Sequence, residues 1–137
     1  MKEFVLDASV ALGWLADVQP SDYAARVQRV MVEGCRAVVP VHWHLEIANA
    51  LVVGARRKVL RREMGAILQD LAALLPFVER DDLPDDIGAL VGTCQREQLT
   101  AYDAAYIALA ARRALPLATQ DAAMAAAAGR LKIPLVK

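Results

Sequence analysis

The sequence has 137 residues, enough for a single domain over residues 1–137 with a substantial core. Sixteen basic and sixteen acidic residues cancel, which excludes a globally basic nucleic-acid-binding protein, so any contact with nucleic acid must be local. Hydrophobic residues make up 57% of the chain, yet no apolar run approaches the roughly 18 residues of a membrane span. Glu3 and Asp7 interrupt the N-terminal stretch where a signal peptide would be continuously apolar, so we expect a soluble, cytoplasmic protein.

Short apolar runs alternate with longer helical segments along the chain. We expect strands at 3–6, 37–40, 77–79, 116–119 and 133–137. Helices are expected at 9–16, 21–33, 43–57, 61–75, 85–98, 103–114 and 121–129. This alternation predicts an α/β fold with a parallel sheet covered by helices on both faces. The strands are almost wholly apolar, as strands buried on both faces should be.

The cysteines and histidines form no recognisable metal-binding pattern. Cys35 and Cys94 stand alone in the sequence, which indicates two reduced thiols and suits a cytosolic protein. His42 and His44 are two residues apart, a poor spacing for a helical metal pair. We therefore expect these histidines to mark the entry to a helix.

The segment "HLEIANALVVGA" (44–55) reads as a helix that is apolar nearly all round and should be buried. Glu46 and Asn49 interrupt it, and their spacing of three residues places them on one face. A buried carboxylate is costly unless something pairs with it. Glu46 lies inside the helix and fits no capping role, so it is a candidate functional residue.

Three aspartates also stand among apolar residues. Asp7 and Asp121 each follow a predicted strand, at the carboxyl ends where open α/β sheets place their ligands. Asp103 lies in the first turn of the helix "YDAAYIALAA". Each of them also fits a simpler role, because Asp7 and Asp121 could be N-caps and Thr100 to Asp103 fits a capping box. The remaining aspartates read as surface charges, including the solvated connection formed by Asp81, Asp82, Asp85 and Asp86.

Carboxylates that converge without matching basic residues would repel one another. Mg²⁺ and Mn²⁺ relieve such repulsion because these ions prefer oxygen ligands. The chain has no Gly-rich phosphate loop and no GxSxG elbow. The chemistry best suited to an all-carboxylate metal site is phosphodiester hydrolysis, in which the metal activates water and stabilises the oxyanions of the displacement.

Four acidic segments together resemble the PIN-domain family and, within it, the VapC-type toxins of bacterial toxin–antitoxin pairs. The segments are "FVLDASVAL", "HLEIANAL", "LTAYDAAYIALA" and "LATQDAAMAAAA", and the third is the most specific. The resemblance covers almost the whole chain. It implies an α/β/α sandwich with a parallel sheet in the order 3-2-1-4-5. It also implies a Mg²⁺- or Mn²⁺-dependent endoribonuclease that forms a homodimer and is blocked by a small DNA-binding antitoxin, as in type II toxin–antitoxin systems.

The resemblance assigns roles to particular residues. It implies that Asp7, Asp103 and Asp121 hold the metal most directly, while Glu46 acts through metal-bound water. Ser9 and Thr119 would orient these ligands. Asn49 would either position Glu46 or serve packing or helix capping. The implied catalytic and metal-binding set is therefore Asp7, Glu46, Asp103 and Asp121, supported by Ser9, Asn49 and Thr119.

A basic stretch, "ARRKVLRR" (55–62), is the strongest candidate for contact with RNA phosphates. It would form a ridge if the preceding helix continued, because Arg57 and Arg61 are four residues apart, as are Lys58 and Arg62. The alternative is a solvated junction between two helices. The candidate RNA-binding set is Arg56, Arg57, Lys58, Arg61 and Arg62, with Arg112 and Arg113 as a weaker second site. We expect core or interface roles for Trp14, Trp43, Tyr102 and Tyr106.

Two other functions deserve comparison. A phosphoacceptor receiver domain has a similar length and fold, but it carries an acidic pair near the first strand, where this chain has only Asp7. It also carries a lysine between a late strand and a helix, whereas Lys137 is the last residue. A PIN-like fold that only binds a partner is disfavoured because all four acidic positions are intact.

Overall fold

Four strands form a parallel sheet in the computed structural model, which describes residues 1–18 and 20–137. The strands are β1 (Glu3–Leu6), β2 (Arg36–Pro40), β3 (Val78–Asp81) and β4 (Leu117–Ala118). Within the described residues their order is β3-β2-β1-β4, and every pairing is parallel. Glu3 lies opposite Arg36, and Val5 lies opposite both Val38 and Leu117. The predicted parallel sheet is therefore confirmed.

The fifth predicted strand, 133–137, is reduced to one isolated parallel bridge between Leu117 and Leu135. This bridge continues the expected order beside β4, but it does not amount to a strand. The neighbouring prolines explain the short ladder, because Pro116 and Pro134 have no N–H to donate. Backbone bonds from Leu117 N to Pro134 O and from Val136 N to Leu117 O hold the segment in place, each 2.9 Å long.

Seven α-helices and one 3₁₀ turn connect the strands in the described part of the chain. Their bounds agree with the predicted segments to within a few residues, and none of them is long and apolar enough to cross a membrane. They are α1 (Ala8–Leu15), α2 (Asp22–Val32), α3 (Trp43–Arg56), α4 (Met64–Leu74), η1 (Leu75–Phe77), α5 (Ile87–Glu97), α6 (Ala101–Arg113) and α7 (Ala122–Arg130).

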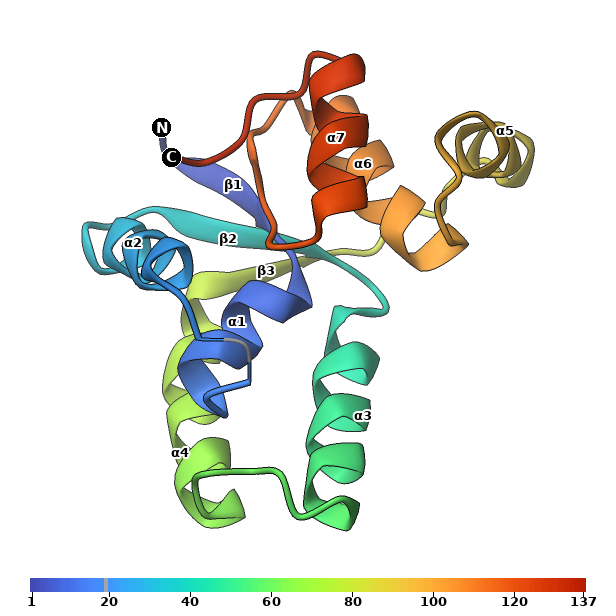
Figure 1. Cartoon of the computed structure of the whole chain (residues 1–137). Coiled ribbons are helices and arrows are strands. Elements are labelled where there is room, and N and C mark those ends of the chain that lie inside the picture. Colours follow the sequence, from blue (N-terminus) through green and yellow to red (C-terminus); the bar gives the residue numbers. More distant parts are fainter. Residues whose placement is uncertain (19) are drawn as a thin grey trace.

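Helices cover both faces of the sheet, as Figure 1 shows. On one side α6 packs against β1, β2 and β4, with α7 and α5 beside it. On the other side α1 packs against α2, α3 and α4. The central strands β1 and β2 lie between these layers, so Phe4, Val5, Leu6, Val38 and Val39 are fully buried. This is the α/β class that the alternation of strands and helices predicts.

Strand β3 departs from the expected apolar pattern, since its sequence is VERD and none of its residues is fully buried. It lies at the edge of the sheet, with β2 on one side only. Charged side chains are common on edge strands because they discourage pairing with another chain. Glu79 and Arg80 are thus consistent with the position of this strand, which the sequence alone did not reveal.

The prediction that segment 44–55 is buried on all sides was wrong. Helix α3 is amphipathic, with its buried positions at Trp43, Ile47, Leu51 and Gly54. On the opposite face Leu45 is 73% exposed. The physical reason is that α3 packs on one side only, where its buried residues and α4 line a common apolar pocket. Apolar composition therefore overestimated the burial of this helix.

Candidate active site

The candidate acids gather where the order of the sheet reverses. Chain connections run from β1 outward to β2 and β3 on one side, whereas β4 lies on the other side of β1. Open α/β sheets bind ligands at the carboxyl ends of strands at such a switch point. Asp7 follows β1 and Thr119 follows β4 at this edge. A backbone bond of 3.0 Å from Asp7 N to Ala118 O continues the pairing beyond both strands.

Asp7 is buried, with 5% of its surface exposed, and two hydroxyl groups hold it. Ser9 and Thr119 each donate a hydrogen bond of 2.8 Å to Oδ2 of Asp7. Burial raises the pKa of Asp7 above its ordinary value, while these two hydrogen bonds act in the opposite direction. Asp7 occupies the N-cap position of α1, but its side chain makes no capping bond. The simple capping role is therefore wrong for Asp7.

The negative charges of the other three acids act on Asp103. It lies half-buried in the first turn of α6, and its backbone N–H donates to Oγ1 of Thr100 at 3.2 Å. Burial raises the pKa of Asp103 most, followed by the negative charges of Asp121, Asp7 and Glu46. The structure therefore brings the four predicted acids near one another, although they come from four different segments.

Asp121 combines a capping role with a place in this cluster. Its Oδ1 accepts a hydrogen bond of 2.7 Å from Met124 N at the start of α7. Its own N–H donates to Oγ1 of Thr119 at 3.0 Å. Thr119 therefore contacts both Asp7 and Asp121, which links the two strand ends. The capping role predicted as the simpler alternative is confirmed for Asp121.

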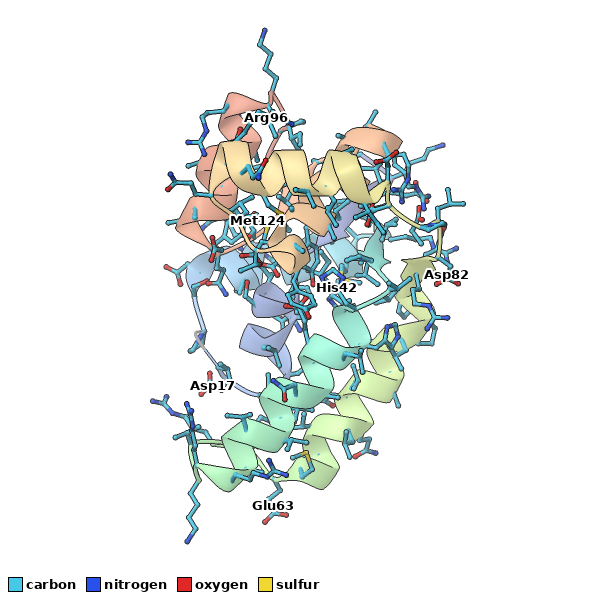
Figure 2. The ribbon with its side chains drawn as sticks, turned by 90° about the vertical axis from the view of Figure 1, so that its right-hand side faces the viewer. Asp17, His42, Glu63, Asp82, Arg96 and Met124 are labelled. Carbon is cyan, nitrogen blue, oxygen red and sulfur yellow. The ribbon has the colours of Figure 1, made fainter. Side chains whose placement is uncertain are left out.

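Glu46 has polar partners that the sequence did not reveal. The phenol of Tyr106 donates a hydrogen bond of 2.7 Å to Oε1 of Glu46. Nε2 of His42 lies 3.1 Å from the same oxygen, but the two groups are not aligned as a hydrogen bond. The side chain of Glu46 is 34% exposed, so the predicted burial among apolar residues was wrong. Figure 2 shows His42 at the end of α3 nearest the sheet.

Tyr106 and His42 are the neighbours of the site that sequence reasoning missed. Tyr106 is fully buried, and its hydroxyl oxygen also accepts a bond of 3.4 Å from Ala8 N. The ring of His42 meets the rings of Tyr102 and Tyr106 edge-on, with centroids 5.6 Å and 5.2 Å apart. The sequence did contain a signal for these neighbours. Tyr106 stands three residues after Asp103, and His42 stands four residues before Glu46, spacings that place side chains on one face of a helix.

A model of the PIN domain matches residues 4–130 of this sequence. The chain belongs to the PIN-domain family. PIN domains are generally nucleases, and these nucleases typically use divalent metal ions. Membership of this family removes the receiver domain from consideration.

Two solved structures are similar to this PIN domain. The protein PAE2754 from Pyrobaculum aerophilum is 23% identical, with a TM-score of 0.71 over 91% of this chain and 78% of the other. A toxin–antitoxin complex from Klebsiella pneumoniae is 18% identical, with a TM-score of 0.57 over 86% of each chain. At these identities the similarity concerns the fold alone. No curated protein gives a significant sequence match.

The carboxylates of this PIN domain share a pattern of contacts. The contacts to Asp7 reach Oδ2, the cap of Asp121 uses Oδ1, and both neighbours of Glu46 reach Oε1. Among the described residues the second oxygen of each of these three groups has no hydrogen-bond partner, and no Lys or Arg forms an ion pair with any of the four acids. The contacts of Asp7, Asp121 and Glu46 are thus concentrated on one oxygen of each group.

This donor set fits a hard divalent cation, because it consists of carboxylate oxygens that repel one another and that no Lys or Arg among the described residues neutralises. The side chains are not arranged as a closed cage. Within residues 1–18 and 20–137, no three His, Cys, Asp or Glu side chains stand in positions that could hold a metal ion together. The carboxylates would have to move closer together to complete such a site.

Asn49 does not join the cluster. It is exposed on α3, and no hydrogen bond connects it to Glu46 in the part of the chain that the structure describes. The predicted spacing of three residues places the two side chains on neighbouring positions of the helix, but only Glu46 reaches α6. Among the described residues Asn49 therefore forms no hydrogen bond with the other candidate residues.

The basic stretch 55–62 does not form the predicted helical ridge. Helix α3 ends at Arg56, Arg57 is its C-cap, and Lys58 adopts a positive φ of 56°. Arg61 lies 3.5 Å from Asp17, as an exposed ion pair. Arg56, Arg57 and Lys58 remain exposed and free to meet an anionic ligand.

Arg62 has a structural role. Its Nη1 donates to Leu15 O at 2.7 Å, and its Nη2 pairs with Asp70 at 2.8 Å. Leu15 is the last residue of α1, so Arg62 satisfies a carbonyl that has no partner within that helix. The guanidinium thereby ties the connection between α3 and α4 to the end of α1.

Arg112 and Arg113, the second candidate site for RNA binding, form ion pairs. Arg112 pairs with Asp81 at 2.8 Å, and Arg113 pairs with Glu79 at 2.9 Å and with Asp81 at 3.4 Å. The side chain of Asp81 is only 7% exposed. The description of residues 81–86 as a solvated connection was therefore wrong for Asp81, which fastens the end of α6 to β3.

Proposed function

We propose that this PIN-domain protein is a Mg²⁺- or Mn²⁺-dependent endoribonuclease, the toxin of a type II toxin–antitoxin pair. The observation that carries the proposal is the convergence of acids at the switch point of the sheet, where the charges of Asp7, Glu46 and Asp121 all act on Asp103. Burial and the charges of Asp7, Glu46 and Asp121 raise the pKa of Asp103. Among the described residues no Lys or Arg pairs with these acids, whereas a divalent cation would relieve their repulsion.

In the proposed site Asp7, Asp103 and Asp121 hold the metal most directly, and Glu46 completes the set. Ser9 and Thr119 donate to Oδ2 of Asp7, which favours the charged form of this buried group. A bound Mg²⁺ or Mn²⁺ supplies activation of water and stabilisation of the phosphodiester oxyanions.

The substrate is RNA, and its backbone reaches the site past the exposed residues Arg56, Arg57 and Lys58. These residues lie at the far end of α3 from Glu46, a separation of about 15 Å for ten residues of helix. That distance corresponds to a few nucleotides of an extended strand. Contacts of this kind add affinity and little sequence preference.

The direct test is cleavage of RNA by the purified protein. We expect cleavage with Mg²⁺ or Mn²⁺, products with 5′-phosphate and 3′-hydroxyl ends, and no cleavage after chelation with EDTA. Asp103→Asn should abolish cleavage. Asp82→Asn is the matched control, because Asp82 is 62% exposed and lies at the edge of the molecule away from His42 in Figure 2. Cleavage that survives chelation, or 2′,3′-cyclic phosphate ends, would contradict the metal mechanism.

The proposed biological role includes a cognate antitoxin, a homodimer and action in the cytoplasm. Support comes from the family and from the fold shared with a toxin–antitoxin complex from Klebsiella pneumoniae. Expression of the protein alone should arrest bacterial growth, and co-expression of a small neighbouring antitoxin should relieve the arrest. Light scattering should give twice the mass of the 14.8 kDa chain. If Asp103→Asn is well expressed and equally toxic, nuclease action is not the cause of toxicity.

A further inference from the structure

The phenol of Tyr106 connects three segments that carry candidate site acids. Its hydroxyl donates to Oε1 of Glu46 at 2.7 Å and accepts from Ala8 N at 3.4 Å. Ala8 follows Asp7 directly at the start of α1, Glu46 lies on α3, and Tyr106 itself stands one turn after Asp103 on α6. One oxygen atom therefore lies between the elements that position Asp7, Glu46 and Asp103.

The hydroxyl group is not needed to fill the core. Tyr106 is fully buried, and a phenylalanine ring would occupy the same apolar surroundings without a polar atom to satisfy. Instead the oxygen has one acceptor and one donor in reach. Burial, followed by the nearby charges of Asp7 and Glu46, raises the pKa of Tyr106 above its ordinary value, which favours the neutral phenol that donates to Glu46.

The contact is also specific to Glu46. Helix α6 packs on β1, β2 and β4, whereas α3 packs on α1, and the bond from Tyr106 to Glu46 joins these two helices. His42 lies against the ring of Tyr106 and next to the same Oε1 atom. Without the phenol, Glu46 is free to turn toward His42 or toward solvent, because its side chain is 34% exposed.

We propose that Tyr106 is a positioning residue, which holds Oε1 of Glu46 so that Oε2 meets the metal ion. This inference rests on the proposed nuclease function. Partners that orient a metal ligand typically contribute about 10–100-fold to metal affinity or activity. Tyr106→Phe should therefore weaken binding of Mn²⁺ by about tenfold.

The test is a set of Mn²⁺ titrations of the full chain, followed by calorimetry or by electron paramagnetic resonance. Tyr102→Phe is the matched control, because it removes the same atom from a tyrosine that is 65% exposed, one turn earlier on α6. We expect wild-type affinity for Tyr102→Phe and weakened affinity for Tyr106→Phe. In the Glu46→Gln background, Tyr106→Phe should cause no further loss.

Equal affinities of Tyr106→Phe and the wild type, in a wild type that binds Mn²⁺ and cuts RNA, overturn the inference and leave the proposed function intact. Independent losses in the double variant also overturn it, because Tyr106 would then not act through Glu46. A wild type that neither binds Mn²⁺ nor cuts RNA overturns both. Should Tyr106→Phe fail to fold, 4-aminophenylalanine at position 106 keeps a donor on the ring, and weak Mn²⁺ binding by that folded variant contradicts the proposal.

Discussion

Thr119 donates its hydroxyl to Oδ2 of Asp7 across 112 positions of sequence, in a hydrogen bond of 2.8 Å. The bond exists because β4 pairs directly with β1, so the residues that follow these strands become neighbours. Together with Ser9, Thr119 favours the charged form of a carboxylate that burial disfavours. Burial thus makes the charged form of Asp7 costly in the metal-free protein, and the two hydroxyl groups reduce that cost.

The first prediction concerns the pH dependence of stability. The pKa of Asp7 in the folded protein lies above its ordinary value of 3.8 because of burial. Between these two values the folded state binds more protons than the unfolded state, so the free energy of unfolding falls as pH rises. The pKa of Asp103 is raised as well, so Asp103 also lowers the free energy of unfolding as pH rises.

Asp7→Asn removes the contribution of Asp7. In buffer with EDTA, this variant should be more stable than the wild type above the raised pKa, and the difference should shrink as pH falls toward the ordinary value. Thermal melts between about pH 4 and about pH 8 measure this effect. Saturating Mg²⁺ should reduce the difference in stability between Asp7→Asn and the wild type, since a ligand stabilises the folded state that binds it. A wild type that gains stability over Asp7→Asn as pH rises without metal would contradict this account.

The sequence predicted the elements and the edge of the sheet at which Asp7 and Asp121 lie, for a physical reason. Strands and helices follow from apolar periodicity, and Asp7 and Asp121 could be placed because parallel strands end at a common edge. The partners of these acids could not be placed in the same way. That Tyr106 lies on one face with Asp103 follows from helical spacing, but the approach of α3 to that face depends on tertiary packing.

The basic residues show more clearly what the sequence alone could not predict. Arg57 and Arg62 look alike in the sequence, yet only Arg62 bonds to the end of α1 and to Asp70. The positive φ of Lys58 turns the chain and separates their surroundings. Charge patterns predict an exposed basic surface, whereas the carbonyl that Arg62 satisfies is visible only in the folded chain.

The second prediction separates these two arginines by stability. Arg62→Met should lower the free energy of unfolding by about 1–2 kcal/mol, because it leaves Leu15 O without its partner and removes the pair with Asp70. Arg57→Met, at an exposed position, should change it by less than about 0.5 kcal/mol. Urea unfolding of both variants provides the comparison. Equal losses would show that Arg62 has no special structural role.

The third prediction concerns RNA binding by the exposed part of the basic stretch. Replacing Arg56, Arg57 and Lys58 with Glu should weaken RNA binding regardless of sequence and flatten its dependence on salt. The rate of a single turnover at saturating RNA should change much less. The measurement is binding across a series of salt concentrations with an inactive Asp103→Asn background. An unchanged slope would remove this stretch from the path of the RNA.

The fourth prediction concerns Asp81, which pairs with both Arg112 and Arg113 and is nearly buried. Asp81→Ala should destabilise the protein by about 2 kcal/mol, because two guanidinium groups lose a shared partner. Asp82→Ala is the control, since the carboxylate of Asp82 is 62% exposed and forms an exposed ion pair with Arg80. Cleavage per folded molecule should be the same in both variants. A selective loss of cleavage in Asp81→Ala would mean that this end of α6 takes part in the reaction.

The last prediction separates the two roles of Asp121. Oδ1 of Asp121 caps α7 through Met124 N, while the charge of the group raises the pKa of Asp103. Asn caps helices about as well as Asp, whereas Ala costs about 1 kcal/mol. Asp121→Asn should therefore keep wild-type stability without metal or exceed it slightly, because one of four repelling charges is gone. Asp121→Ala should be less stable by about 1 kcal/mol.

Both variants of Asp121 should lose Mn²⁺ affinity and RNA cleavage, because each removes an anionic oxygen from the site. Melting curves with and without Mn²⁺, together with a cleavage assay, give the three quantities for each variant. If Asp121→Asn cuts RNA as the wild type does, then capping is the whole role of this residue, and the metal must rest on Asp7, Glu46 and Asp103. If Asp121→Asn is instead as unstable as Asp121→Ala, the charge itself stabilises the start of α7 through the helix dipole.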